Sequence, residues 1–181
     1  AVISLTVSRK YARAFLQIGQ KDGSFEALGR DLDRLHSLLQ ENKELRIVLY
    51  GFAYPAPTRK KIVGELTKAL GLSKTTGDFL NLLIERERMD HFAEIVKSYQ
   101  ALCDEAANRI RATLVTPGDL PGDRVEEVRN QLEMRTGKQV LLSLERDPSL
   151  IGGALTRIGN LIYDGSLKTQ LSKGRENRYK E

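Results

Sequence analysis

Tryptophan is absent from the sequence and cysteine occurs once, at Cys103. A single cysteine excludes an internal disulfide and any cysteine-based zinc site. No uninterrupted apolar run approaches the roughly 20 residues that a membrane-spanning helix needs. Ala1 to Ser8 lack a basic patch followed by a long apolar stretch, so we expect no secretory signal. These absences predict a chain that does not insert into the membrane and that suits a reducing compartment.

The sequence also lacks a catalytic constellation. His36 and His91 lie far apart, and neither has a second metal ligand at metal-binding spacing. Cys103 falls on an apolar stripe, which favours a small buried side chain over a nucleophile. Gly152-Gly153 and Gly159 are not followed by Gly-Lys-Ser/Thr, so a bulge or tight turn is favoured over a nucleotide site. We therefore expect no enzyme activity, no cofactor and no metal.

What the sequence has is a balance of hydrophobic (40%) and charged (29%) residues, which indicates a globular protein of 181 residues with a net charge of +5. Basic clusters occur at 59–61 and in the tail from 168 to 180. Acidic residues interrupt them, and no aromatic strand motif for stacking bases is present. No nucleic-acid partner is therefore expected. A basic two-domain factor associated with RNA or the ribosome stays open as the alternative, and so does a small enzyme with its site in an interdomain cleft.

Helical periodicity fills the first hundred residues. Apolar side chains recur at three- and four-residue spacing in segments that begin near residues 7, 24, 45, 58, 75 and 90. We expect the first of these helices to end at Gly19 and the Asp22-Gly23 turn signal, and the fourth to end at Gly71. Ser24, Thr58 and Thr75 are the expected N-caps of the second, fourth and fifth helices. The pattern predicts a bundle of six helices over residues 1–107.

Beyond residue 107 the period changes to that of strands. Alternating apolar residues at 110–114 and 140–144 predict two strands, with a helix over 125–132 between them that stops at Gly137. Two short strands follow over 154–163 around Gly159-Asn160, and Asp164 or Ser166 can cap a last helix. The chain is thus expected to be an α+β two-domain protein. A small α/β domain at 108–181, with a short sheet and two helices, follows the helical bundle.

One C-terminal segment resembles a known family. Residues 147–153 (DPSLIGG), 157–160 (RIGN) and 163–167 (YDGSL) are similar in order to the C-terminal signature of the F-type ATP synthase delta subunit and the oligomycin-sensitivity-conferring protein. Residues 8–15, 79–90 and 110–117 resemble three further family motifs, so the resemblance covers nearly the whole chain. Asn160 stands where the family usually has Asp, and either residue fits a tight turn.

The resemblance implies a non-catalytic subunit of the peripheral stalk, or stator, within a hetero-oligomeric complex. The domain 1–107 is expected to bind the N-terminal segment of an alpha subunit, and the domain 108–181 the C-terminal ends of the b subunits. The protein would thereby resist rotor torque during proton-driven ATP synthesis. A peripheral location on the cytoplasmic face of a bacterial inner membrane is expected, and the matrix face of mitochondria is the alternative.

Contact residues follow from the resemblance together with helical spacing. An amphipathic partner helix needs an apolar groove. The expected alpha-binding residues lie on the first and fifth helices: Tyr11, Ala14, Phe15, Ile18, Phe79, Leu80, Leu83 and Ile84. The competing interpretation is that all of them are bundle core. The expected b-binding residues are Ile151, Leu155 and Leu167.

Overall fold

The computed structural model describes residues 2–150, 154–158 and 161–164, and the side chains of 6–150 and 154–158. The chain divides into two compact units, Ala1–Cys103 and Asp104–Glu181. The division falls inside the last helix of the first unit, whereas the sequence pattern places a boundary after residue 107, where the period changes. Each unit is described below by itself.

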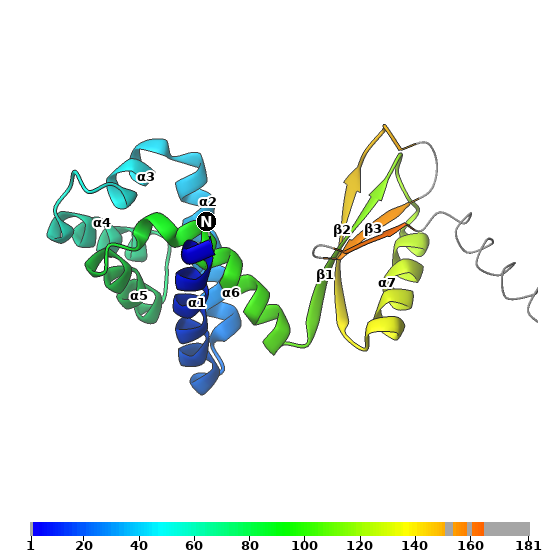
Figure 1. Ribbon diagram of the computed structural model, residues 1–181, viewed down its shortest axis with the longest axis horizontal. Coiled ribbons are helices and arrows are strands. Elements are labelled where there is room, and N and C mark those ends of the chain that lie inside the picture. Colours follow the sequence, from blue (N-terminus) through cyan, green and yellow to red (C-terminus); the bar gives the residue numbers. More distant parts are fainter. Residues whose placement is uncertain (1, 151–153, 159–160, 165–181) are drawn as a thin grey trace, which may run out of the picture. The chain divides into compact units, whose positions relative to one another are not determined.

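The first unit is helical (Figure 1). In chain order its helices are α1 (Val2–Asp22), α2 (Phe25–Glu41), α3 (Lys43–Tyr50), α4 (Ala56–Ala69), α5 (Lys74–Glu85) and α6 (Phe92–Ala106), with the 3₁₀ turn η1 (Met89–His91) before α6. Each segment with helical period thus contains one of these helices. No helix among the described residues is long and apolar enough to cross a membrane.

One hydrophobic core joins these helices. Fully buried side chains come from α1, α2, α3, α5 and α6, among them Phe15, Leu32, Leu49, Leu83 and Phe92. Figure 1 shows α4 and α5 running side by side. Burial of each large apolar side chain contributes roughly 1.5–3 kcal/mol to folding, which makes this shared core the main reason that the helices stay together.

Tyr99 links the core to the start of α2. Its hydroxyl donates a hydrogen bond of 2.7 Å to the carbonyl oxygen of Phe25. Its ring lies so close to α2 that a Cβ added at Gly29 would meet the Tyr99 Cε1 atom at 3.3 Å. The ring therefore occupies space that a larger side chain at position 29 would need.

The predicted helix starts need correction. Ser24 makes no side-chain cap for α2, because its hydroxyl donates to the Asp22 carboxylate at 2.6 Å. Thr58 lies inside α4, which begins at Ala56 after Pro55. Ser73, not Thr75, caps α5 by accepting the backbone N–H of Thr76 at 3.1 Å. Several polar residues compete at each of these starts, and the sequence alone does not rank them.

The predicted helix ends agree with the structure except at Gly19. The first helix continues past Gly19 and ends at Asp22, at the predicted Asp22-Gly23 turn signal. Gly19 is tolerated there because α2 passes close by, and a Cβ at position 19 would meet the Phe25 Cα atom at 2.7 Å. Gly71, by contrast, follows α4 with a φ of +62°, the left-handed conformation that glycine adopts at helix ends.

The second unit is built on a four-stranded sheet in the order β2-β1-β3-β4. Its strands are β1 (Arg109–Thr116), β2 (Gln139–Arg146), β3 (Leu155–Ile158) and β4 (Leu161–Asp164), and α7 (Gly122–Thr136) connects β1 to β2. β1 and β2 are parallel, with Ile110 opposite Val140, while β3 is antiparallel to both β1 and β4. Gly137 ends α7 at a φ of +65°, as the sequence predicts.

The sheet follows the predicted alternation in part. Ala112, Leu114 and Val140 are buried, and they share one face of the sheet through the β1–β2 register. Against the prediction, Val115 on the other face is also buried, and Leu144 is 56% exposed near the end of β2. Figure 1 shows α7 lying along the sheet beside β2. The predicted turn at Gly159-Asn160 and the predicted last helix after Asp164 lie outside the described residues.

Candidate partner-binding surfaces

The seam between α1 and α5 is held by two stacked aromatic rings. The ring centroids of Phe15 and Phe79 lie 4.1 Å apart, with an angle of 14° between the ring planes. Tyr99 packs against the Phe15 ring from α6, at a centroid distance of 5.4 Å. The two helices that the sequence singled out for alpha binding are therefore in direct contact through a rigid aromatic pair.

The eight expected alpha-binding residues separate by exposure. Five of them are buried in the core, with exposed fractions between 0% and 6%: Phe15, Phe79, Leu80, Leu83 and Ile84. Tyr11 is partly buried, Ala14 is exposed, and Ile18 is 48% exposed. A partner touching this seam would therefore meet mainly Tyr11, Ala14 and Ile18, with the buried five shaping the floor behind them.

Leu82 belongs with this surface, although sequence reasoning did not select it. It is 38% exposed, a high value for a leucine on a packed helix. Ile18 lies three residues after Phe15, and Leu82 lies three residues after Phe79, so each is on the same side of its helix as a stacked ring. Ala14, Ile18 and Leu82 are referred to below as the seam surface.

Ion pairs fix the far end of α5 to α4. The Arg59 side chain is 3% exposed, and its Nη2 donates to both carboxylate oxygens of Glu87 at 2.9 and 3.0 Å. Lys60 pairs with Glu85, and this contact lowers the pKa of the Glu85 carboxyl. Glu87 has a φ of 52°, an unusual conformation for a residue with a side chain. Its pairing with Arg59 offsets that strain.

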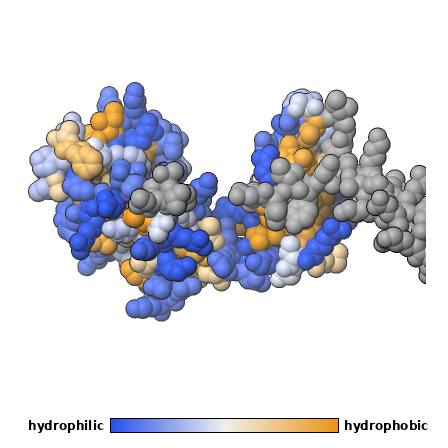
Figure 2. All heavy atoms as spheres, in the orientation of Figure 1, coloured by the Kyte–Doolittle hydropathy of each residue, from blue (hydrophilic) through white to orange (hydrophobic). Residues whose placement is uncertain are grey.

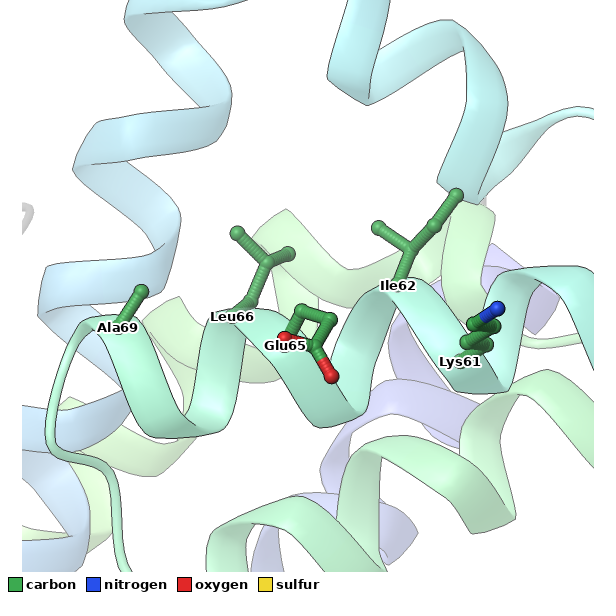
Figure 3. Close-up of a pocket in the computed structure, with 5 residues that line it drawn as sticks. All are labelled: Lys61, Ile62, Glu65, Leu66 and Ala69. Carbon is green, nitrogen blue, oxygen red and sulfur yellow. The ribbon is translucent and has the colours of Figure 1, made fainter.

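A second apolar surface lies on α4. Ile62, Leu66 and Ala69 point to the same side of this helix, with Lys61 and Glu65 beside them (Figure 3). They line a shallow hollow of about 310 Å³. Three further hydrophobic residues are exposed at or after α3, namely Ile47 (55%), Phe52 (71%) and Tyr54 (42%). Figure 2 shows hydrophobic residues at the surface over this part of the helical unit.

The expected b-binding residues are less well placed. Ile151 and Leu167 lie outside the described residues. Leu155 opens β3, where it is half-buried and opposite Val115 of β1. Among the described side chains of this unit, large exposed apolar ones lie elsewhere, at Met134 (79%) and Leu144 (56%).

The ionisable groups of the described residues form no catalytic arrangement. Within those ranges no group of three or more His, Cys, Asp or Glu side chains could hold a metal ion. His36 Nε2 lies 3.4 Å from Gln40, and His91 lies 3.8 Å from Asp90. Burial, together with the nearby Glu94 carboxylate, raises the pKa of Tyr50 to about 12.

Comparison with known proteins agrees with the resemblance seen in the sequence. Residues 7–177 match the sequence model of a family described as ATP synthase delta (OSCP) subunit. The chain belongs to this family. It is 38% identical over 170 residues to "ATP synthase subunit delta" of Desulfosudis oleivorans, covering 94% of this chain and 93% of that protein. It is 39% identical over 173 residues to the protein of the same name from Desulforapulum autotrophicum, covering 96% and 94%.

The fold of this delta (OSCP) family member is also similar to a solved one. A chain of the Toxoplasma gondii mitochondrial ATP synthase hexamer, determined by cryo-electron microscopy, superposes with a TM-score of 0.71. The match covers 94% of this chain and 96% of that chain at 20% identity. The mixed α+β architecture expected from the sequence is therefore confirmed, helical first and α/β second.

Proposed function

We infer that the chain is the delta subunit of a bacterial F-type ATP synthase, a structural stator protein of a hetero-oligomeric complex and not an enzyme. Family membership over residues 7–177 carries this inference, and it decides against an RNA-associated factor and against a cleft enzyme. The bacterial relatives, named ATP synthase subunit delta, support a peripheral place on the cytoplasmic face of the inner membrane.

The helical unit binds the N-terminal segment of an alpha subunit at the seam surface. Support comes from the exposed Ile18 and Leu82, each of which lies three residues after one ring of the stacked Phe15–Phe79 pair. An amphipathic helix lying along the seam would cover both side chains, and burying exposed apolar area is the main favourable term in such binding. Because the stacked rings beneath it are already packed, the seam surface needs little rearrangement to accept its partner.

Variants of exposed residues test this assignment cleanly. Phe15→Asp and Leu83→Asp would place a charge at positions that are 0% exposed and would unfold the protein. Ile18→Asp and Leu82→Asp change residues that are 48% and 38% exposed, so the fold should survive. Ile47→Asp is the matched control, because Ile47 is 55% exposed on α3, away from the seam.

The measurement is the affinity of the full chain for a peptide that copies the alpha subunit's N-terminus. We expect Ile18→Asp and Leu82→Asp each to weaken binding by about ten-fold or more, since removing an apolar anchor costs roughly 1–3 kcal/mol. Ile47→Asp should bind as the unaltered chain does. If Ile47→Asp weakens binding while both seam variants do not, the assignment to the seam is wrong.

The second unit is the proposed contact for the C-terminal ends of the b subunits. Of the three expected contacts, Leu155 lies within the part of the chain that the structure describes. The exposed Leu144 adds apolar surface in the same sheet. In this arrangement the two units hold the catalytic head and the stalk at once. The proposed role is to transmit resistance to torque during proton-driven ATP synthesis.

A further inference from the structure

A buried carboxylate on α2 contacts the start of α5. Asp31 is 7% exposed. Its Oδ2 atom accepts the backbone N–H of Ser73 at 2.8 Å and the hydroxyl of Thr76 at 2.9 Å. Thr76 is itself 0% exposed, so its bond to Asp31 is buried, while the bond from Ser73 is partly buried. A charged acceptor with two such donors is a strong and directional contact.

The place of this carboxylate matters because α5 begins there. The first backbone N–H groups of a helix have no partner within the helix, and they give that end a partial positive charge. Ser73 covers the N–H of Thr76 with its own hydroxyl at 3.1 Å, and Asp31 takes the N–H of Ser73. The first turn of α5 is thereby tied to α2 by charge as well as by hydrogen bonds.

The same turn is pressed against α4. A Cβ added at Gly77 would meet the Thr67 Oγ1 atom at 3.3 Å, and that hydroxyl donates to the carbonyl oxygen of Val63 at 2.7 Å. Phe79 follows Gly77 by two residues and stacks on Phe15. The position of α5 along the seam is therefore set within one turn of the contact with Asp31.

A neighbouring carboxylate on the same helix provides the contrast. Asp33 accepts a hydrogen bond from the Gln100 Nε2 atom at 2.5 Å, which ties α2 to α6. Two residues apart on α2, Asp31 and Asp33 thus hold different helices. Asp31 holds α5, which carries Leu82 of the seam surface, whereas Asp33 holds α6, which carries no residue of that surface.

We propose that Asp31 is the positioning residue of the partner-binding seam: its carboxylate fixes the first turn of α5, so that Phe79 stacks on Phe15 and the helix that carries the exposed Leu82 is held against α1. The proposal rests on the alpha-binding function inferred above. Without Asp31, α5 occupies its binding-competent position for only part of the time. The apparent affinity then falls in proportion to that fraction, and the loss appears in the association rate.

Association and dissociation rates of the alpha-subunit peptide test this with the full chain. Asp31→Ala should bind about ten-fold more weakly, mainly through slower association. Asp31→Asn should recover part of the loss, since an amide oxygen can accept the same two hydrogen bonds without the charge. Asp33→Ala should retain wild-type rates, although losing its contact with Gln100 lowers stability. Circular dichroism establishes beforehand that each variant is folded at the temperature used.

The results separate the proposal from the function on which it rests. If the unaltered chain fails to bind the peptide, the alpha-binding function falls and the proposal with it. If the chain binds and Asp31→Ala binds equally well, the function stands and the positioning role is overturned. Equal weakening in Asp31→Ala and Asp33→Ala would also overturn it, since that points to a general loss of stability.

Should Asp31→Ala fail to fold, Thr76→Val takes its place, because it removes one of the two donors while keeping the buried shape. Slower association of Thr76→Val than of the unaltered chain, by less than the ten-fold expected for Asp31→Ala, supports the proposal. Wild-type rates in both Thr76→Val and Asp31→Asn contradict it.

Discussion

Replacing Glu87 by glycine sets two effects against each other. The backbone at position 87 has a φ of 52°, so glycine would relieve roughly 1 kcal/mol of conformational strain. The same change removes both hydrogen bonds to Arg59, whose side chain is 3% exposed. Stranding one partner of a buried pair costs about 3–5 kcal/mol. Because the Glu87 side chain is 45% exposed, solvent weakens the ion pair, and we expect its loss to cost about 2–3 kcal/mol.

We therefore expect Glu87→Gly to destabilise the helical unit by about 1–2 kcal/mol, corresponding to a fall in Tm of roughly 4–16 °C for a unit of this size. Urea unfolding followed by far-ultraviolet circular dichroism measures it, because the signal comes mainly from the helices. Pairing the change with Arg59→Met should recover stability, since no charge is then left buried without its partner.

Asn108→Gly is the control for strain alone. Asn108 has a φ of 51° but is exposed, and its side chain makes one long hydrogen bond of 3.4 Å to Gly137. This variant should be neutral or slightly stabilising. A Glu87→Gly protein that is more stable than the unaltered chain would refute the reasoning, by showing that strain outweighs the ion pair.

Three further predictions concern stability. Gly19→Ala should destabilise the helical unit, because its Cβ would meet the Phe25 Cα atom at 2.7 Å. Gly64→Ala has open space and should stabilise that unit by roughly 0.5–1 kcal/mol. Thermal unfolding compares the two variants. Phe79→Ala should cost about 3–5 kcal/mol in urea unfolding, since it removes a ring that is 6% exposed and stacked in the core. The pKa of Tyr50 is raised from 10.0 to about 12 in the folded chain. The contribution of its neutral hydroxyl to stability is therefore complete below pH 10.0 and is lost as pH rises towards 12. Tyr50→Phe should reduce that loss of stability in alkaline unfolding curves.

Helix positions could be predicted from the sequence because their apolar residues recur with the helical period, and packing uses the same residues. The residues that cap the helix N-termini could not be predicted in this way. Ser24, Thr58 and Thr75 are all good cap formers, yet Ser24 bonds to Asp22 and Ser73 takes the place expected for Thr75. The choice depends on tertiary contacts such as the one between Asp31 and Ser73, which join residues that are 42 positions apart.

The candidate site shows the same limit. The expectation that Phe15 and Phe79 lie along one seam rests on the family resemblance, and their rings do stack. Their part in binding a partner stays a prediction. Their burial was not predictable, since a stripe does not reveal which of its members face a neighbouring helix and which face solvent. Leu82 was passed over because α5 is apolar on most sides. Exposure, which requires the fold, is what distinguishes it.

A bridging experiment tests the central claim most directly. The full chain is mixed with a catalytic head prepared without its delta subunit and with the soluble part of the b subunits, and complexes are separated by size. We predict one complex containing all three components. The Ile18→Asp, Leu82→Asp double variant should keep the b subunits and lose the head. A double variant that still bridges head and b subunits, or an unaltered chain that joins neither, would contradict the claim.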